Sequence, residues 1–337
     1  MKPTDFSKML EDFLVKYLPG ERGMRLNTIA SYKDTFILLI RFFKQEQAIE
    51  PEKLTLSFLD KNSITRFLDW LQQNRNCCDA TRNVRLATLH SFFKFLQYRN
   101  PENMNRWQDI LSIRVKKTAS KAVNYLSVEC IRLLLEKPDR TTWRGRRDLA
   151  LLSLMYDCGA RVQEIIDLTA ASIRCEKPYT IKIIGKGNKV RIVPLMDNQY
   201  QILRNYMQEN NLLQPCMNQS VLFYNSRKEP LTRAGVNHIL KKYLDMVVED
   251  KKISVPDGIS CHSLRHSKAM HLLQAGTNIV YIRDLMGHKS VITTEIYART
   301  DSKHKREALE KASIAIVSKE EPGWLYNDDL LKWLKNL

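Results

Sequence analysis

The chain has 337 residues, enough for about two domains, and its 54 Lys and Arg against 37 Asp and Glu give a formal net charge of +17. This excess favours a polyanionic partner, most commonly nucleic acid, although a basic surface without such a partner has the same composition. No long apolar run, secretory signal or Cys-x-x-Cys pair occurs, and the seven cysteines are scattered, which argues against a membrane span, a disulfide scaffold or structural zinc. We therefore expect a cytoplasmic, nucleoid-associated protein with no membrane, metal or cofactor requirement.

Residues 1–113 are predicted to form an all-helical domain. Apolar side chains recur at helical spacing over residues 6–17, and Pro19-Gly20 is a stop signal. Further helices are predicted to begin at about residues 27, 63 and 79. The last of them carries Arg82, Arg85 and Lys94, which could form a solvated basic face or contact the phosphates of a DNA groove.

Residues 114–124 are predicted to link two domains. The sequence from Arg114 to Lys121 is short and basic and lacks apolar periodicity. Lys116 and Lys117 in this segment are candidate contacts to a phosphate backbone.

The second domain, residues 125–300, is predicted to be helical around one β-hairpin. Helical patterns cover residues near 131–135 and a run from 147 to about 168. β-rich segments at 179–182 and 190–193 flank Gly-Lys-Gly-Asn, which is typical of a hairpin turn. Helical patterns return near 197–210, 232–249, 263–275, 278–286 and 304–313. Residues 301–337 form a tail whose last helix would carry Leu330, Trp333, Leu334 and Leu337 on one face.

Four short motifs in the second domain contain side chains that could cut a phosphodiester bond without a metal ion. Such a reaction needs a nucleophile, donors that stabilise charge on the non-bridging oxygens, and an acid for the leaving oxygen. In the first motif Arg161 precedes Glu164 by three residues, so a buried carboxylate could orient the guanidinium; the alternative is a surface ion pair. In the second, Lys186 in the hairpin turn could donate a proton, and Lys189 and Arg191 are candidate phosphate contacts.

The third and fourth motifs supply imidazoles, a second guanidinium and a phenol. His262 and Arg265 share a helical face in the sequence His-Ser-Leu-Arg-His, with the leucine turned to the core. His288 follows Leu-Met-Gly and precedes Tyr297 by nine residues. A tyrosine is more often a packing residue than a nucleophile. Its phenol, with an ordinary pKa of about 10, needs basic neighbours that remove or share the proton.

In this order the motifs resemble the tyrosine recombinase, or phage-integrase-like, family. The family pattern is Arg, Lys, His-x-x-Arg, His (or Trp) and Tyr, and it is filled here by Arg161, Lys186, His262, Arg265, His288 and Tyr297. The methionine before Gly-His, where leucine is usual, is a conservative apolar change. The resemblance implies a mainly α-helical protein with a small β-sheet: an all-α N-terminal core-binding domain that clamps DNA, and an α+β catalytic domain.

The resemblance also implies a role for each position. Tyr297 attacks the scissile phosphate and forms a 3′-phosphotyrosine, the two arginines hold the non-bridging oxygens, and His288 donates a further hydrogen bond. Lys186 is the implied acid for the 5′-oxygen, and His262 is implied to assist proton movement at the tyrosine. Glu164 would hold the side chain of Arg161 in position without itself contacting the phosphate.

The implied partner is double-stranded DNA with paired inverted half-sites. Four copies of the chain would act on two duplexes through a Holliday junction, without ATP, metal or cofactor. The tail, residues 301–337, would dock into a neighbouring protomer or fold back onto its own domain. The sequence does not predict whether accessory proteins take part.

Three other classes compete with this interpretation. A type IB topoisomerase uses nearly the same chemistry on one duplex, and a DNA-binding regulator shares the charge but does not need the six positions. A metal-dependent nuclease or DDE-type transposase needs a carboxylate cluster, which is not apparent. Within the recombinase interpretation, residues 27–36 resemble integrases and transposases of mobile elements, so this role is favoured over an Xer-like dimer resolvase.

Overall fold

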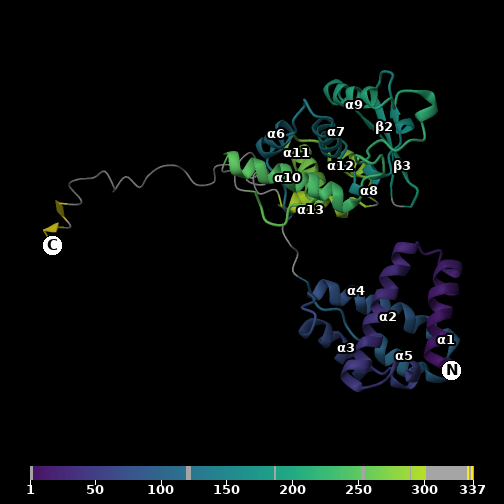
Figure 1. The fold of residues 1–337 in the computed structure, drawn as a ribbon. Coiled ribbons are helices and arrows are strands. Elements are labelled where there is room, and N and C mark those ends of the chain that lie inside the picture. Colours follow the sequence, from purple (N-terminus) through teal and green to yellow (C-terminus); the bar gives the residue numbers. More distant parts are fainter. Residues whose placement is uncertain are drawn as a thin grey trace. The chain divides into compact units, whose positions relative to one another are not determined.

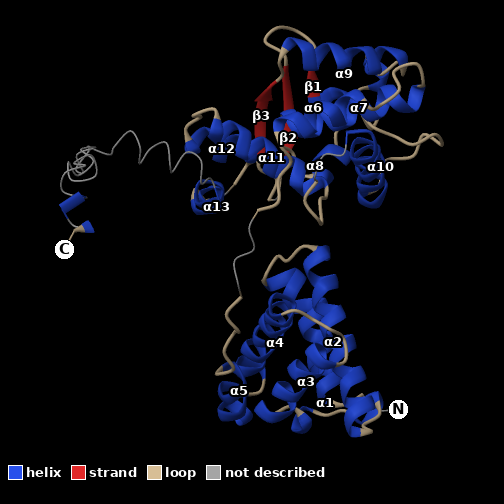
Figure 2. Ribbon diagram, turned by 90° about the vertical axis from the view of Figure 1, so that its left-hand side faces the viewer, coloured by secondary structure: helices blue, strands red, loops and turns tan. Residues whose placement is uncertain are grey.

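The computed structural model describes residues 3–118, 123–185, 187–251, 255–288, 290–300, 332, 333, 335 and 336. The chain divides into two compact units, Met1–Lys121 and Ala122–Leu337 (Figure 1). Helices predominate in both, and the strands belong to the second unit (Figure 2), which confirms the predicted fold class. Lys186, the helix predicted near 304–313, and Leu330, Leu334 and Leu337 of the tail lie outside the described residues. Among the residues described, no helix combines the length and apolar character needed to cross a bilayer.

The first unit packs its helices around an aromatic core. Phe13, Phe36 and Phe92 have at most 1% of their surface exposed, and their ring centroids lie 5.1–6.1 Å apart. The helices are α1 (Asp5–Glu11), η1 (Asp12–Glu21), α2 (Leu26–Gln47), α3 (Lys61–Gln73), α4 (Asp79–Arg99) and α5 (Met104–Leu111). Pro19 does not end the first helical stretch, because η1 is a π-helix and its wider turns continue to Glu21. Helix α5 was not predicted from the sequence.

The predicted basic face of α4 is wrong for two of its three residues. Arg82 is 4% exposed, because it lies on the same stripe of the helix as the buried Leu86 and Leu89. Arg85 donates from Nη1 to the Ser31 carbonyl and Thr35 Oγ1 on α2, each at 3.0 Å. Arg85 therefore ties α4 to α2, whereas Lys94 is exposed.

The second unit surrounds a three-stranded antiparallel sheet with helices. The strands β1 (Ile173–Arg174), β2 (Thr180–Ile184) and β3 (Val190–Pro194) lie in the order β1-β2-β3, and Ile183 pairs with Arg191. This confirms the predicted hairpin. The helices are α6 (Val128–Glu136), α7 (Trp143–Asp157), α8 (Val162–Ile166), α9 (Asp197–Glu209), α10 (Arg233–Lys251), α11 (Cys261–Gln274), α12 (Ile279–Met286) and α13 (Ile292–Thr300).

The continuous helix predicted from 147 to about 168 is wrong, because the chain breaks between α7 and α8. Gly159 has φ +53°, a left-handed conformation that ends α7 and that glycine adopts without steric cost. Arg161 then caps the N-terminus of α8 with extended backbone. The break therefore places Arg161 at a helix start.

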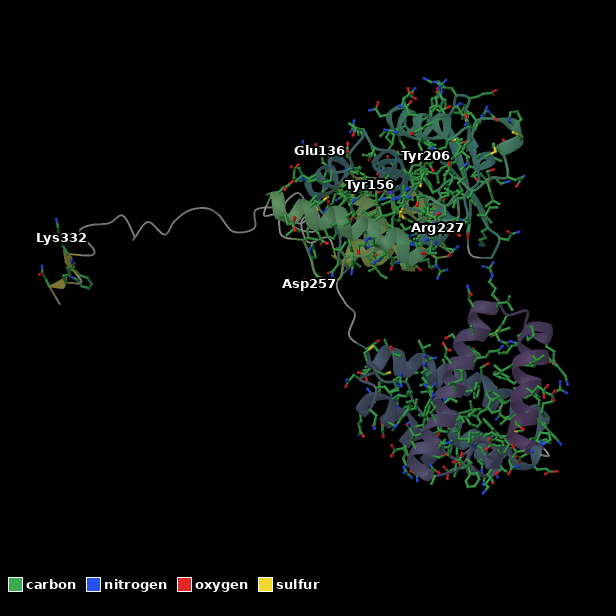
Figure 3. The ribbon with its side chains drawn as sticks, in the orientation of Figure 1. Glu136, Tyr156, Tyr206, Arg227, Asp257 and Lys332 are labelled. Carbon is green, nitrogen blue, oxygen red and sulfur yellow. The ribbon has the colours of Figure 1, made fainter. Side chains whose placement is uncertain are left out.

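Tyrosine side chains fix α7 and α9 within this unit (Figure 3). Tyr206 on α9 is 1% exposed, donates from Oη to the Leu222 carbonyl at 3.0 Å, and stacks on Phe223. The hydroxyl of Tyr156 on α7 lies 2.9 Å from Nδ1 of His271, so α7 is tied to α11. The helix that carries the third motif is thus anchored to the core.

Gly159→Ala is predicted to destabilise the chain more than Gly276→Ala, a matched control. Both glycines have positive φ, so each alanine costs about 1–2 kcal/mol in backbone strain. A Cβ at Gly159 would also lie 2.6 Å from Cε of the fully buried Met286, whereas nothing lies within 4 Å at Gly276. The flexible end of Met286 must shift to make room, and because that side chain is fully buried this shift adds to the loss. Denaturant unfolding of both variants measures the difference, and equal losses would contradict the proposed contact.

Candidate active site

The four motifs meet in the second unit. Arg161 begins α8, His262 and Arg265 lie in the first turns of α11, His288 follows α12, and Tyr297 lies on α13. Helices α11, α12 and α13 pack against one another (Figure 1). The position of Lys186 is outside the described residues, although the strands on either side of its turn are described.

Arg265 is the most deeply buried charged residue of this group, with 1% of its surface exposed. Its Nη1 donates to the Gly159 carbonyl at 2.5 Å, and Nη2 donates to the Met286 carbonyl. Burial and, secondarily, the charge of Arg161 lower the pKa of Arg265 to about 10, so the guanidinium stays charged at neutral pH. Neutral carbonyl partners fix its position and leave its positive charge uncompensated.

Glu164 accepts hydrogen bonds from two guanidinium groups. Its Oε1 lies 2.7 Å from Arg161 Nη1, and its Oε2 lies 2.9 Å from the Arg161 backbone nitrogen and 2.7 Å from Arg191 Nη2. Burial by itself would raise the pKa of Glu164. The hydrogen bonds from Arg191 and from the Arg161 backbone, together with the two positive charges, instead lower this pKa to about 2. The carboxylate is therefore ionised and orients both arginines.

Arg191, a predicted phosphate contact, lies largely inside the unit. Its side chain is 11% exposed and points from β3 toward Glu164. A Cβ added at Gly287 would lie 3.1 Å from Arg191 Nη1, so the guanidinium also packs against the loop before His288. A buried carboxylate is costly unless it is paired, and Arg191 supplies a partner for Glu164. Lys189 is exposed and stays a predicted phosphate contact.

Tyr297 lies in a small apolar cluster with its hydroxyl hydrogen-bonded. The side chain is 2% exposed and packs with Met270, Ile282 and Met286. Its Oη lies 2.8 Å from Nδ1 of His266. Burial raises the pKa of the phenol, although the nearby Arg265 and Arg161 lower it in part, so the hydroxyl is protonated at neutral pH.

Two imidazoles lie beside the phenol, and a third contacts one of them. The rings of His262 and His266 meet edge to face with centroids 4.4 Å apart, and the His288 ring lies parallel to Tyr297 at 6.4 Å. Nδ1 of His288 is 2.9 Å from Thr294 Oγ1. Burial lowers the pKa of His262, and it lowers the pKa of His266 and of His288 to about 4, so these two are neutral at pH 7.

His266 is the residue that the sequence interpretation missed. The prediction gave proton movement at Tyr297 to His262, whereas the structure places His266 at the hydroxyl. The signal in the sequence was the second histidine of His-Ser-Leu-Arg-His, four residues after the first and so on the same helical face.

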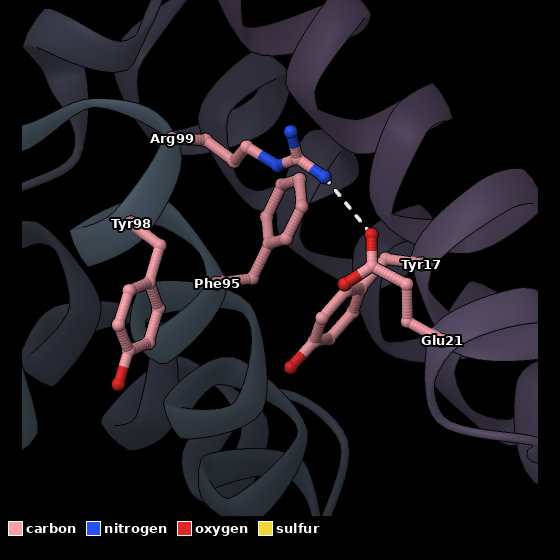
Figure 4. A pocket seen from close by; sticks show the side chains of 5 residues that line it. All are labelled: Tyr17, Glu21, Phe95, Tyr98 and Arg99. Atoms are coloured by element: carbon pink, nitrogen blue, oxygen red, sulfur yellow. Dashed lines mark hydrogen bonds and ion pairs between the residues drawn. The ribbon is translucent and has the colours of Figure 1, made fainter.

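The first unit carries further candidate DNA contacts. Lys116 and Lys117 are exposed, and Lys116 Nζ donates to Gln72 Oε1 at 2.6 Å. The first unit also has a cavity of about 310 Å³ that contains none of the predicted site residues (Figure 4). It is lined by Tyr17, Glu21, Phe95, Tyr98 and Arg99, with Arg99 and Glu21 paired at 2.9 Å. Within the described ranges, no three His, Cys, Asp or Glu residues are grouped to hold a metal ion.

Comparison with known proteins identifies the family. Residues 124–304 match the phage integrase family, and residues 10–100 match the N-terminal SAM-like domain of phage integrases. A putative integrase/recombinase, y4rC, of Sinorhizobium fredii is 33% identical and aligns over 100% of this chain and 99% of its own length. The tyrosine recombinase XerD of Staphylococcus haemolyticus is 30% identical over 89% of this chain and 96% of its own.

Solved structures show the same fold. The XerH site-specific recombinase, crystallised on its palindromic difH substrate after cleavage, superposes with a TM-score of 0.69 at 24% identity and covers 87% of this chain and 81% of its own. The chain therefore belongs to the phage integrase family of tyrosine recombinases. The predicted family and the predicted class of enzyme, a tyrosine-type site-specific DNA recombinase, are confirmed.

Glu164→Gln is predicted to destabilise the second unit by about 3–5 kcal/mol, because it leaves two partly buried guanidinium groups without their carboxylate. Glu129→Gln is the matched control, since Glu129 also pairs with an arginine three residues away but more than half of each side chain is exposed. It should change the free energy of unfolding little, because surface ion pairs are screened by water. Denaturant titration of both variants distinguishes them. Similar losses of unfolding free energy in the two variants would show that burial of the Glu164 ion pairs does not increase their contribution to stability.

The contribution of Glu164 to folding stability should decrease as the pH falls. A carboxylate whose pKa is lower in the folded state stabilises the fold above its unfolded pKa of about 4.3 and loses this effect as the pH falls toward the folded value of about 2. The stability difference between the unsubstituted chain and Glu164→Gln should therefore shrink between pH 5 and pH 2. A difference that stays constant over this range would contradict the ionised carboxylate.

Proposed function

We propose that the chain transfers DNA strands through a covalent 3′-phosphotyrosine at Tyr297. The observation that supports this most directly is that described residues of three motifs, Arg161, the neighbours Arg265 and His266, and His288, lie around one phenol. Arg265 anchors α11 to the ends of α7 and α12, and the same packing places Tyr297 beside His266 and His288. A packing tyrosine has no need of two guanidiniums and three imidazoles in its surroundings.

The proposed roles follow the chemistry of each group. Arg161 and Arg265 offset the charge that develops on the non-bridging oxygens, and His288 donates a further hydrogen bond to them. Lys186 protonates the leaving 5′-oxygen, and His262, whose ring contacts His266, assists movement of the phenol proton. The phosphotyrosine conserves the energy of the broken bond, so rejoining by the 5′-hydroxyl needs neither ATP nor a metal ion.

The partner we propose is double-stranded DNA with paired inverted half-sites. Four copies of the chain would hold two duplexes and pass through a Holliday junction. The crystal structure of XerH in complex with its DNA substrate supports DNA as the partner. The exposed lysines Lys94, Lys116, Lys117 and Lys189 are the proposed phosphate contacts. Binding of chromosomal DNA would associate the protein with the nucleoid.

Each segment of the chain has a proposed part in that complex. Residues 1–113 form the DNA-clamping domain, residues 114–124 the linker, and residues 125–300 the catalytic domain. Residues 301–337 form a tail that docks onto a neighbouring protomer. The separate matches to the SAM-like and catalytic domains support the first and third assignments.

The biological role we propose is integration or excision of a mobile element. The end-to-end alignment with the putative integrase/recombinase of Sinorhizobium fredii supports it. The alternative is an Xer-like dimer resolvase, which the alignment with XerD over 89% of this chain supports. Recombination between two plasmid-borne ends of the host element, compared with resolution of plasmid dimers, separates the two roles.

Tyr297→Phe is predicted to abolish covalent attachment to DNA, because it removes the attacking oxygen and little volume. The purified chain is mixed in EDTA with a pool of nicked duplexes of randomised sequence, from which a cleaved fragment diffuses away. Denaturing gels then reveal protein-linked DNA, and sequencing of the captured DNA gives the site. Tyr281→Phe, at a tyrosine that is 72% exposed on α12, is the control and should form the adduct normally. An adduct on Tyr297→Phe would refute the assignment.

Lys186→Ala is predicted to slow cleavage by about 10²–10⁴-fold, the usual contribution of a positioned general acid. A substrate with sulfur at the 5′-bridging position should restore the rate, since a thiolate leaves without protonation. Lys189→Ala tests charge on the same hairpin and should weaken DNA binding without preferential rescue by sulfur. If sulfur does not rescue Lys186→Ala, another residue is the acid.

A further inference from the structure

His266 occupies the position that a proton acceptor for Tyr297 needs. Its Nδ1 lies 2.8 Å from the phenol oxygen, within hydrogen-bonding reach. Both residues are carried on packed helices, α11 and α13, so the pair is held by the fold rather than by a surface loop. With the phenol as donor, Nδ1 is the acceptor and the imidazole carries its own proton on Nε2.

The burial of Tyr297 favours such an acceptor. With 2% of the side chain exposed, few water molecules can contact the phenol. Burial also raises the pKa of the phenol, which opposes spontaneous ionisation. A base that already contacts Oη can take the proton during attack, without prior ionisation of the phenol.

The groups around His266 keep its ring neutral and disfavour its protonation until an anion binds. The ring faces His262 and Arg265 of its own helix, Tyr297 of α13, and His288 after α12. Burial and the charge interactions with His262 and Arg265 lower its pKa to about 4, so the acceptor lone pair is free at neutral pH. A phosphate anion held by the arginines would add the opposite charge and favour the protonated imidazole as the reaction proceeds.

His262 lies one step farther from the phenol. Its ring contacts His266 edge to face at 4.4 Å, and its own side chain is exposed. The T-shaped contact positions the His266 ring but does not bring His262 to the oxygen that must lose its proton.

We infer that His266, rather than His262, is the general base for Tyr297. The inference rests on the proposed phosphotyrosine mechanism and adds one step to it. The O–H bond of Tyr297 breaks, its proton moves to Nδ1 of His266, and its electron pair forms the new bond from oxygen to phosphorus. The bond from phosphorus to the 5′-oxygen breaks, and that oxygen takes a proton from Lys186. Rejoining reverses each transfer, and His266 returns the proton to the phenol.

His266→Asn tests the inference because the side-chain amide of asparagine can take the place of Nδ1. Its oxygen can accept the hydrogen bond from Tyr297 but cannot take the proton. Single-turnover formation of the Tyr297 adduct is measured on two nicked substrates, one with the ordinary 5′-bridging oxygen and one with sulfur. His262→Asn is measured alongside. His238→Asn, at an exposed histidine of α10, is the control for loss of an imidazole elsewhere.

The expected result is a loss of about 10²–10⁴-fold for His266→Asn on both substrates. Sulfur should not rescue it, because the defect lies in the attack and not in the leaving group. DNA binding and thermal unfolding of this variant should match those of His238→Asn, which separates chemistry from folding.

Adduct formation by His266→Asn within about threefold of the unsubstituted chain would overturn the inference alone. A loss of adduct formation that is confined to His262→Asn would also overturn the inference. Rescue of His266→Asn by the sulfur substrate would overturn it too, because His266 would then act in protonation of the leaving group. A faster reaction in His266→Asn would show that His266 restrains the tyrosine instead. Failure of the unsubstituted chain to form any Tyr297-dependent adduct would overturn the proposed function and the inference together.

Discussion

The buried carboxylate of Glu164 is the interaction on which the arrangement of the catalytic unit depends. Its two oxygens receive Arg161 from the start of α8 and Arg191 from β3, so a single side chain joins the α7–α8 break to the hairpin. This one carboxylate interacts with three guanidinium groups, those of Arg161, Arg191 and Arg265. The group therefore carries an excess of two positive charges. Such an excess is unfavourable in a partly buried site without an anion, and a phosphate monoanion relieves it. The electrostatics of this site therefore favour binding of a phosphate anion.

Arg265 contributes to this field without a countercharge of its own. Its partners are the carbonyls of Gly159, just beyond the end of α7, and of Met286, the last residue of α12. Carbonyls at helix C-termini lack intrahelical donors and carry partial negative charge, so a guanidinium satisfies them. The charge is fixed in place before a substrate arrives, and little reorganisation is needed when charge develops on a phosphate. The left-handed turn at Gly159 and the methionine before Gly-His are thus parts of the site, although neither side chain performs chemistry.

The sequence was sufficient to predict the residue types of the site and insufficient to predict some of its contacts. Motif spacing and turn chemistry identified the hairpin and the Arg161–Glu164 pair, because these features depend on neighbours close in the chain. The choice between His262 and His266 depends on how α13 docks on α11, which is set by the packing of Tyr297 against α11 and α12. The inward turn of Arg191 depends likewise on a carboxylate 27 residues away. Periodicity also marked Arg82 as part of a basic face, because a long arginine on a buried stripe has the same spacing as one in solvent.

Burial of the nucleophile determines when it can react. Arg161 and Arg265 partly offset the cost of a buried phenolate, and they are the groups proposed to hold the scissile phosphate. When a phosphate anion engages them, their positive charge is shared and less of it favours ionisation of Tyr297. A phenolate formed in advance would therefore become less favourable as the substrate bound. Transfer of the proton during attack avoids this conflict, because the negative charge passes to the phosphoryl oxygens, which the arginines contact directly. A neutral acceptor already hydrogen-bonded to Oη is the arrangement that such a concerted transfer requires, and His266 is in that position.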